Sequence, residues 1–415
     1  MGLKRVVITG LGTINPLGHN VAETWENMLN GVSGAGPITR FDASNFKTQF
    51  ACEVKDYNPV NFFDRKEVRK MDLYTQFGII AAREAIQDSG IDLENANKKR
   101  IGVIWGAGIG GLQTFFEESY NFAMGKDMPR FNPFFIPKMI ANIAGGMIAI
   151  EYGFKGPNYT TVSACASSAH ALVDALNLLR LGKADIIVCG GSEAAVSVPG
   201  VGGFNALHAL STRNDDPKTA SRPFDADRDG FVIGEGGACL ILEEYEHAVQ
   251  RGAKIYAELA GGAANCDAYH MTAPDPEGNG ACDVMLEAMA DAGIPAEQLD
   301  YINVHGTSTG LGDIAEPTAI MKAFGEQAYK LNISSTKSMT GHLLGAAGAI
   351  EAIACVMAVQ NDIVPPTINF HNLAPELDPK LNFTFNEPQK RTINVALSNT
   401  FGFGGHNGCI VIKKV

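Results

Sequence analysis

The sequence predicts an α/β protein made of two similar halves, and three observations support this fold class. The chain has 415 residues, 46% of them hydrophobic, and this length exceeds what one hydrophobic core accommodates. Short apolar runs bounded by glycine or polar turns alternate with alanine-rich stretches, a pattern typical of strands and helices in sheets covered on both faces. A segment of the first half also recurs in the second half, which indicates a duplicated unit.

The recurring segment is Glu84–Ile91, which is similar in sequence to Glu287–Ile294 at a spacing of 203 positions (287 − 84). Each copy predicts a helix that ends at a glycine, followed by a short charged loop and a strand. A second echo pairs the small-residue turn and helix of residues 163–181 with that of residues 337–360. We therefore divide the chain into residues 1–253 and 254–415.

Apolar runs and turn residues place the remaining elements. A helix is expected at Glu244–Lys254, and the proline-rich segments 129–137 and 365–379 are expected to be loops within the fold. The expected strands are Arg5–Gly10, Ile101–Gly106, Ile186–Gly190, Cys239–Glu243, Ile255–Leu259, Tyr301–Gly306 and Val395–Ser398.

Composition excludes several function classes. The net charge of −12 argues against nonspecific nucleic-acid binding, which needs a basic surface. The eight cysteines form no Cys-x-x-Cys pair and lack histidines at zinc-finger spacing, so we expect reduced thiols in a cytoplasmic protein and no metal site. The first residues contain no signal-peptide core, and no uninterrupted run of eighteen apolar residues occurs, so no membrane association is expected.

Two motifs resemble binding sites but lack the rest of their patterns. Gly106–Gly111 follows a strand and has dinucleotide-site glycines, but the second strand with an acidic end is replaced by a loop. We expect a tight turn beside a substrate pocket. Asp225–Gly230 resembles the start of a calcium loop, but position 12 of that loop is Gly236, so we expect a salt-bridged structural turn.

Cys165 is the strongest candidate for a reactive residue. It lies among small residues where a helix begins, and unpaired amides and the helix dipole at such a position favour the thiolate. A lone cysteine is more commonly a small buried side chain. Its interpretation as a nucleophile therefore depends on whether the chain supplies partners for it.

Other segments supply such partners. His305 follows an apolar strand, so its imidazole is expected at the carboxyl edge of a sheet, where α/β proteins place their sites. Lys337 and His342 lie in a second small-residue turn that opens a helix. Asn399–Asn407 is a glycine-flanked loop with two phenylalanines. Such a loop is suited to act as a mobile gate or to expose backbone N–H groups as hydrogen-bond donors.

With these residues assembled, the chain resembles the β-ketoacyl-acyl carrier protein synthases of type II fatty acid synthesis, essentially from end to end. The resemblance implies the thiolase-like fold, with duplicated βαβαβαββ halves in a five-layered α-β-α-β-α arrangement, and a homodimer. It implies decarboxylative condensation of an acyl group with malonyl-acyl carrier protein. The product is a 3-oxoacyl-acyl carrier protein together with CO₂.

The resemblance also assigns catalytic roles. Cys165 is expected to accept the acyl group, and His305 and His342 are expected to form the decarboxylating pair. Lys337 would support the histidine network, with Glu351 as its carboxylate partner.

Further roles concern substrate binding. Backbone amides of Cys165 and Phe403 are expected to form the oxyanion hole, and Phe401 and Phe403 to form the gate. The hydroxyls of Thr307 and Thr309 would hold the phosphopantetheine arm that carries the substrates. No metal or other cofactor is expected.

The resemblance places a carrier-protein docking site on the basic run at residues 65–70. The expected docking residues are Lys66, Arg69, Lys70 and Arg213, with Lys126 and Arg130 as extensions of the patch. The alternative is an ordinary solvated helix face. Ile109 is expected at the floor of the acyl pocket.

Two departures from the family pattern concern the pocket and its gate. His406 stands where many relatives carry threonine, and Gly310–Asp313 replaces a loop that often contains proline. The alternatives are a thiolase with Cys409 as its second cysteine, a noncatalytic chain-length subunit, and a ketosynthase of a polyketide or polyene pathway. The motif around Cys165 argues against the noncatalytic subunit.

Overall fold

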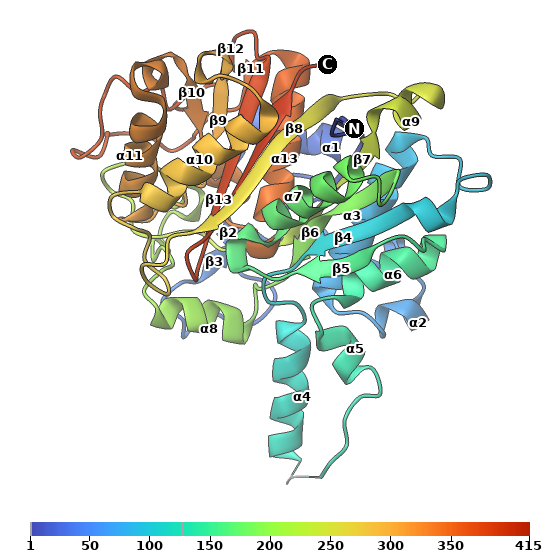
Figure 1. Cartoon of the computed structure of the whole chain (residues 1–415). Coiled ribbons are helices and arrows are strands. Elements are labelled where there is room, and N and C mark those ends of the chain that lie inside the picture. The colour runs from blue at the N-terminus through green and yellow to red at the C-terminus, as the bar shows by residue number, and fades with distance from the viewer. Residues whose placement is uncertain (1, 126–127) are drawn as a thin grey trace.

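The computed structural model describes residues 2–125 and 128–415 (Figure 1). Its main sheet has ten strands in the order β10-β9-β13-β14-β8-β1-β7-β6-β4-β5. The first five of these strands come from the second half of the chain and the other five from the first half. The two sets meet where β1 pairs with β8 in antiparallel fashion, at Val7 opposite Glu258 and Ile8 opposite Ala257.

The first half has the chain order βαβαβαββ. Its elements are β1 (Val6–Ile14), α3 (Leu73–Ser89), β4 (Ile101–Gly106), α6 (Ile143–Tyr152), β5 (Asn158–Thr161), α7 (Ser167–Arg180), β6 (Ile186–Glu193) and β7 (Gly236–Glu244). Strand β4 is parallel to β5 and β6, and β7 is antiparallel to β6 and β1.

The second half repeats this order and these strand directions. Its elements are β8 (Ala257–Cys266), α10 (Asn279–Ala292), β9 (Tyr301–Asn303), α11 (Gly312–Phe324), β10 (Asn332–Ser334), α13 (Ala347–Asn361), β13 (Val395–Gly402) and β14 (His406–Lys413). The duplication predicted from the sequence echo is therefore confirmed element by element.

The helices form three layers around the two sets of strands. Helices α3 and α6 pack on the strands of the first half, and α10 lies on β8 and β14 with α11 beside it. Helices α7 and α13 contact each other and strands of both halves, so they form the central layer. The five-layered α-β-α-β-α arrangement is thus confirmed.

Smaller elements decorate this core. They are α1 (Val21–Leu29), α2 (Arg65–Val68), α4 (Leu112–Met124), α5 (Phe135–Met139), α8 (Val198–Ala206), α9 (Tyr245–Gln250), α12 (Lys337–Thr340), and the short strands β2 (Gly36–Pro37), β3 (Phe50–Ala51), β11 (Ile363–Val364) and β12 (Gln389–Lys390). Helices α4 and α5 extend away from the body of the molecule (Figure 1).

The two helices of the recurring segment, α3 and α10, each end at a glycine. Helix α3 ends at Gly90 and α10 at Gly293, both in the left-handed region with φ near 63–64°. That conformation costs glycine nothing, which explains why the same residue closes both copies.

Some boundaries differ from the sequence expectations. Strands β1, β6, β7, β8 and β13 each extend beyond the expected run, because polar and glycine residues continue the pairing. The expected loop at residues 129–137 ends in α5. Residues Leu344–Asn361 form a helical stretch long and apolar enough to cross a membrane, but 83% of it is buried inside the protein and it contains Glu351. It contains α13, one of the two helices of the central layer.

Candidate functional site

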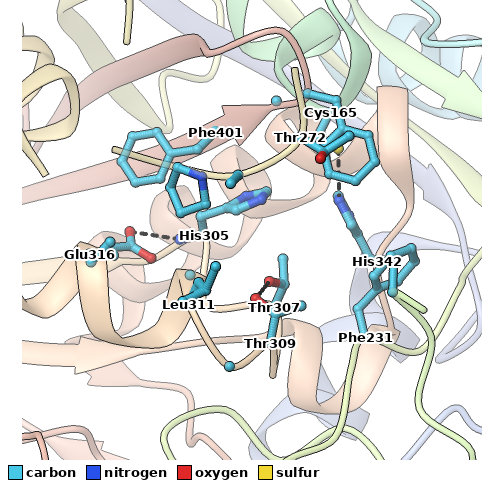
Figure 2. Close-up of a pocket in the computed structure, with 18 of the residues that line it drawn as sticks. Cys165, Phe231, Thr272, His305, Thr307, Thr309, Leu311, Glu316, His342 and Phe401 are labelled. Atoms are coloured by element: carbon cyan, nitrogen blue, oxygen red, sulfur yellow. Dashed lines mark hydrogen bonds between the residues drawn. The ribbon is translucent and has the colours of Figure 1, made fainter. Parts of the chain in front are cut away.

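A cavity of about 390 Å³ lies beside the ends of the central helices and is lined by residues of both halves. Cys165 and Phe231 come from the first half, and His305, His342 and Phe401 come from the second. Figure 2 shows the cysteine and the two histidines directed toward one another in this cavity. The structure thus brings together the residues that the sequence placed in separate motifs.

Cys165 lies on a strained turn at the start of α7. A 3₁₀ turn (Ala164–Ala166) precedes the helix, and Ala164 has φ of 50°, which is unusual for a residue with a side chain. Two bonds hold the turn: the Ser163 amide donates to Ser167 Oγ at 2.9 Å, and the Ser167 hydroxyl donates to the Ala164 carbonyl at 2.7 Å. This arrangement presents the thiol at the N-terminal end of the helix, as predicted.

Burial and nearby donors have opposite effects on the ionisation of Cys165. Burial raises the pKa of the thiol to about 12, although Lys337 and the amides of Phe403 and Cys165 act in the opposite direction. Burial of the sulfur thus opposes the thiolate that the helix start favours, and the thiolate stays a prediction. The sulfur needs a hydrogen-bond donor to stabilise negative charge during attack.

His342 supplies that donor. Its Nε2 lies 3.0 Å from the sulfur of Cys165, and its Nδ1 accepts a hydrogen bond of 3.3 Å from the Leu344 amide. Because Nδ1 accepts, the proton of the neutral ring resides on Nε2 and points at the sulfur. Burial and the charge of Lys337 lower the pKa of His342 well below its ordinary value, which keeps the ring neutral.

His305 completes the pair, two residues beyond the end of β9. Its ring lies 5.3 Å from that of His342, centroid to centroid, and nearly perpendicular to it. The amides of His305 and Gly306 each donate to Glu316 at 2.9 Å, which fixes this backbone. Burial lowers the pKa of His305 well below its ordinary value, and Lys337 and His342 add to this effect.

Lys337 lies behind the two histidines on α12. Its ammonium group donates to the carboxylate of Glu351 on α13, as predicted. Burial raises the pKa of Glu351 to about 7, against the charge of Lys337 and its hydrogen bond. Lys337 is not among the residues that line the cavity, and its positive charge acts on both histidines.

The phenylalanine loop forms the tip of the β13–β14 hairpin. Phe401 packs 5.8 Å from His305 between ring centroids, and the Phe403 amide lies within hydrogen-bonding reach of the Cys165 sulfur. A side chain at Gly402 would place its Cβ 2.8 Å from the Ser163 carbonyl oxygen. Glycine at this position therefore allows the hairpin to contact the cysteine turn.

Two threonines line the opposite wall of the cavity. Thr307 and Thr309 lie on the loop after β9, with their hydroxyl oxygens 3.0 Å apart (Figure 2). Hydroxyls can both donate and accept, so this pair suits a ligand amide.

The glycine-rich motif that follows β4 binds a carboxylate of the protein itself. Glu193, at the end of β6, accepts hydrogen bonds from the amides of Gly108, Ile109 and Gly110 at 2.7–3.2 Å, and from Gly345 at 3.1 Å. This explains the glycines without a nucleotide. Sequence analysis missed Glu193 because it lies more than eighty residues away on another strand.

Three further functional candidates were missed for related reasons. Glu316, Phe231 and Phe204 line the cavity, but none of them has a chemical role that its own segment indicates. The nearest sequence signal is that of Glu316, an acidic residue one helical turn after the loop that bears the threonines.

Several predicted residues are not among those that line the cavity. Ile109 is one of them, with 39% of its surface exposed, and its place at the floor of the acyl pocket stays a prediction. Lys66, Arg69 and Lys70 are on or next to α2, where Lys70 pairs with Glu67 at 2.7 Å. Arg213 lies after α8 and donates to the Asp227 carbonyl at 3.0 Å. Arg130 is exposed, and Lys126 lies outside the described residues.

The second rejected motif is a structural turn, as expected. Asp225 accepts from the amides of His371 and Asn372 at 2.7 and 2.9 Å. Arg228 donates to the carbonyls of Thr309 and Gly310 at 3.0 and 2.8 Å, so this turn holds the loop that bears the threonines.

Comparison with known proteins identifies the family. The family model for the N-terminal domain of β-ketoacyl synthases matches residues 3–248, and that for the C-terminal domain matches residues 256–371. The chain belongs to the β-ketoacyl synthase family.

Full-length relatives of this β-ketoacyl synthase agree with that assignment. It is 49% identical over 415 residues to 3-oxoacyl-[acyl-carrier-protein] synthase 2 of Coxiella burnetii, and the match covers all of both chains. It is 50% identical over 411 residues to the enzyme of the same name from Synechocystis, covering 99% of this chain and 98% of the relative.

Solved structures share the fold. A β-ketoacyl synthase from Burkholderia phymatum superposes with a TM-score of 0.92 at 34% identity, covering 99% of this chain and 100% of that one. A type II polyketide synthase acyl carrier protein in complex with its ketosynthase bound to the hexaketide gives a TM-score of 0.90 at 35% identity, with full coverage of both chains.

For a β-ketoacyl synthase, the position of Cys409 is informative. It is fully buried in β14, opposite Asn399, and it does not line the cavity. The second reactive cysteine that a thiolase would need in the cavity is therefore not provided by Cys409.

Proposed function

We propose that this chain elongates acyl groups by decarboxylative condensation with malonyl-acyl carrier protein in fatty acid synthesis. The observation that carries the proposal is the 3.0 Å contact between His342 Nε2 and the Cys165 sulfur, with the His305 ring beside it in one cavity. One thiol and two neutral imidazoles in contact match the needs of acyl transfer followed by enolate formation.

In the first step the Cys165 sulfur attacks the thioester of an acyl carrier protein. The new bond joins the acyl carbon to Cys165, the bond to the carrier sulfur breaks, and the carrier thiol leaves with the proton that Cys165 gives up. The His342 Nε2 proton stabilises the sulfur as it gains charge. The amides of Cys165 and Phe403 stabilise the tetrahedral oxyanion.

In the second step malonyl-acyl carrier protein replaces the first carrier. Its carboxylate leaves as CO₂, and the electron pair of the broken bond forms an enolate whose oxygen accepts hydrogen bonds from His305 and His342. The enolate carbon then attacks the acyl thioester, which releases the 3-oxoacyl carrier and the Cys165 thiolate. The thiolate takes up one proton to restore the resting enzyme.

These steps move acyl groups and protons but no electrons between redox centres, so the scheme requires no redox cofactor. We further propose that both substrates arrive on the phosphopantetheine arm of the carrier, with its amide at Thr307 and Thr309. The 3.0 Å spacing of the two hydroxyls supports this role.

A ketosynthase of a polyketide pathway is the second candidate. It is favoured by a solved neighbour from a type II polyketide synthase at 35% identity, while the relatives named 3-oxoacyl-[acyl-carrier-protein] synthase 2 are 49–50% identical. The higher identity favours fatty acid elongation.

The test is mass spectrometry of the protein incubated with acyl carrier proteins of several chain lengths. A stable acyl adduct on Cys165 in the His305→Ala/His342→Ala variant is expected. Transfer to another residue, or none at all, would overturn the proposal. Turnover of saturated acyl carriers with malonyl carrier in the wild type, compared with polyketide intermediates, separates the two candidates.

We propose that the acidic carrier docks on the basic residues Lys66, Arg69, Lys70 and Arg213. The net charge of −12 opposes nonspecific attraction of an acidic partner, so local positive charge must supply it. Charge reversal at Lys66 and Arg69 should raise the KM for the carrier and reduce its salt dependence. An unchanged KM at low salt would contradict this docking site.

We also propose that the chain works in the cytoplasm as a homodimer. The protruding α4–α5 region supports the dimer, because it exposes large apolar side chains that a monomer would leave in water. These side chains are Phe115, Tyr120, Met124, Phe131, Phe134 and Ile136. Analytical ultracentrifugation of wild type and of Phe115→Glu/Ile136→Glu tests it, with a monomer expected only for the variant.

A further inference from the structure

His170 connects the two parts of the chain that supply the amides beside the Cys165 sulfur. It lies on α7, five residues after Cys165. Its Nδ1 is 2.8 Å from the hydroxyl oxygen of Ser163, and its Nε2 is 3.0 Å from the carbonyl oxygen of Asn407. Ser163 belongs to the turn that bears Cys165, and Asn407 belongs to the strand that leaves the hairpin tip.

The two bonds define the state of the ring. A carbonyl oxygen only accepts, so Nε2 carries the proton and donates to Asn407. In the neutral ring Nδ1 is then the acceptor, and the Ser163 hydroxyl donates to it. Both ring nitrogens are used, and neither of them faces the reacting groups.

The surroundings leave the ring little room to move. A Cβ at Gly408 would lie 3.1 Å from Cδ2 of His170, so strand β14 packs directly against the imidazole. Asn407 is itself held, because its side-chain amide donates to Asn265 at 3.0 Å and to Asp267 at 2.7 Å.

The amides that this bridge connects come from different halves of the chain. The Cys165 amide belongs to the strained turn before α7, and the Phe403 amide to a hairpin tip in which Gly404 and Gly405 have positive φ. Asn407 pairs with Phe401 across the base of that hairpin. Donors to an oxyanion act only when their positions are fixed within about 0.5 Å.

We propose that His170 is a positioning residue that sets the separation of the Cys165 and Phe403 amides. It rests on the proposed function, since these amides serve the acyl-transfer step. Breaking either bond of the ring should slow acyl transfer to Cys165. It should leave malonyl decarboxylation intact, because that step uses His305 and His342.

Two variants each remove one bond. Ser163→Ala deletes the hydroxyl, and His170→Asn keeps a polar group near the Nδ1 position but cannot reach Asn407. His247→Asn is the matched control, because Nδ1 of His247 is bonded to Glu243 at 2.6 Å and the residue does not line the cavity.

Three quantities are measured for each protein: the rate of acyl-adduct formation on Cys165 by rapid quench and mass spectrometry, the rate at which malonyl carrier becomes acetyl carrier without an acyl donor, and the thermal midpoint. We expect adduct formation to fall about 10- to 100-fold in both variants, somewhat less than the loss of a whole oxyanion donor. Decarboxylation should be unchanged. The double variant should be no slower than the slower single one, because both break one bridge.

The outcomes separate the alternatives. Unchanged adduct formation in His170→Asn, or an equal fall in both steps, overturns the proposal, the latter because it indicates a merely structural role. If His170→Asn does not fold, the proposal is tested with Ser163→Ala alone, from its rates of adduct formation and of malonyl decarboxylation. If the wild type itself forms no adduct on Cys165, the proposed function has failed instead.

Discussion

The ammonium group of Lys337 is bonded to the carboxylate of Glu351 inside the protein, where only 2% and 1% of the two side chains are exposed. At this depth neither charge has water as an alternative partner. Each partner is therefore needed to compensate the buried charge of the other, and the pair is also a source of charge near the histidines.

Removing one partner of this pair should destabilise the protein. We expect Glu351→Leu to lower the free energy of unfolding by about 3–5 kcal/mol, because Lys337 remains as an uncompensated buried charge. The double variant Glu351→Leu/Lys337→Met should recover most of this loss, as measured by urea denaturation. A single variant as stable as the double one would contradict this account.

The two histidines should have separable effects. The Nε2 of His342 lies 3.0 Å from the Cys165 sulfur, so His342→Ala should slow both acyl transfer and decarboxylation. His305→Ala should slow decarboxylation alone, by about 10²–10³-fold for one lost oxyanion donor. Quenched-flow measurement of each step checks this difference. Equal slowing of acyl transfer in both variants would argue against it.

Glu193 should make stability depend on pH. Burial raises its pKa to about 7 in the folded protein, whereas an exposed glutamate titrates near 4.3. Between these values the unfolded chain releases a proton that the folded protein keeps, so raising the pH favours unfolding. The stability of the wild type relative to Glu193→Gln should therefore fall as pH rises to about 7, by at most about 1.4 kcal/mol per pH unit, and then level off.

Urea midpoints of both proteins at pH 5 and pH 8 measure this change. Glu287→Gln, at an exposed site of α10, is the control. A difference between wild type and Glu193→Gln that stays constant with pH would show that Glu193 does not titrate in this range.

A side chain at Gly402 should separate the hairpin from the cysteine turn. A Cβ there would lie 2.8 Å from the Ser163 carbonyl oxygen and 3.2 Å from the Cys165 amide nitrogen. We expect Gly402→Ala to slow acyl transfer by up to about 10²–10³-fold, as for the loss of one oxyanion donor. Gly146→Ala, where a Cβ would meet nothing within 4 Å, should keep full activity. Normal acyl transfer in Gly402→Ala would show that the hairpin can shift without cost.

Much of this architecture could be predicted because it leaves local signals. Gly90 and Gly293 mark helix ends by their backbone conformation, and the echo around them predicted the duplicated halves. Cys165, His305 and His342 were predictable because each follows a strand or opens a helix, and parallel strands bring such positions to one edge.

Other properties arise only when distant segments pack together. The pKa of Cys165 depends on its burial and on Lys337 and the Phe403 amide, which lie far from it in the sequence, so the helix N-terminus is only one of its determinants. The contact of Glu193 with the glycine-rich loop, and that of His170 with Asn407, join residues far apart in sequence. No local sequence pattern in these segments predicts which residue each one contacts.

The division of the active site between the halves has a consequence for the severed protein. Cys165 comes from the first half, while His305, His342, Lys337 and the Phe403 amide come from the second. Strands β1 and β8 pair the halves at two residue positions, and helices α7 and α13 bury apolar side chains against strands of both halves. A chain cut between residues 253 and 254 should thus behave as a split enzyme. Each fragment alone should have no condensing activity, and turnover after mixing should report that the two fragments have reassociated.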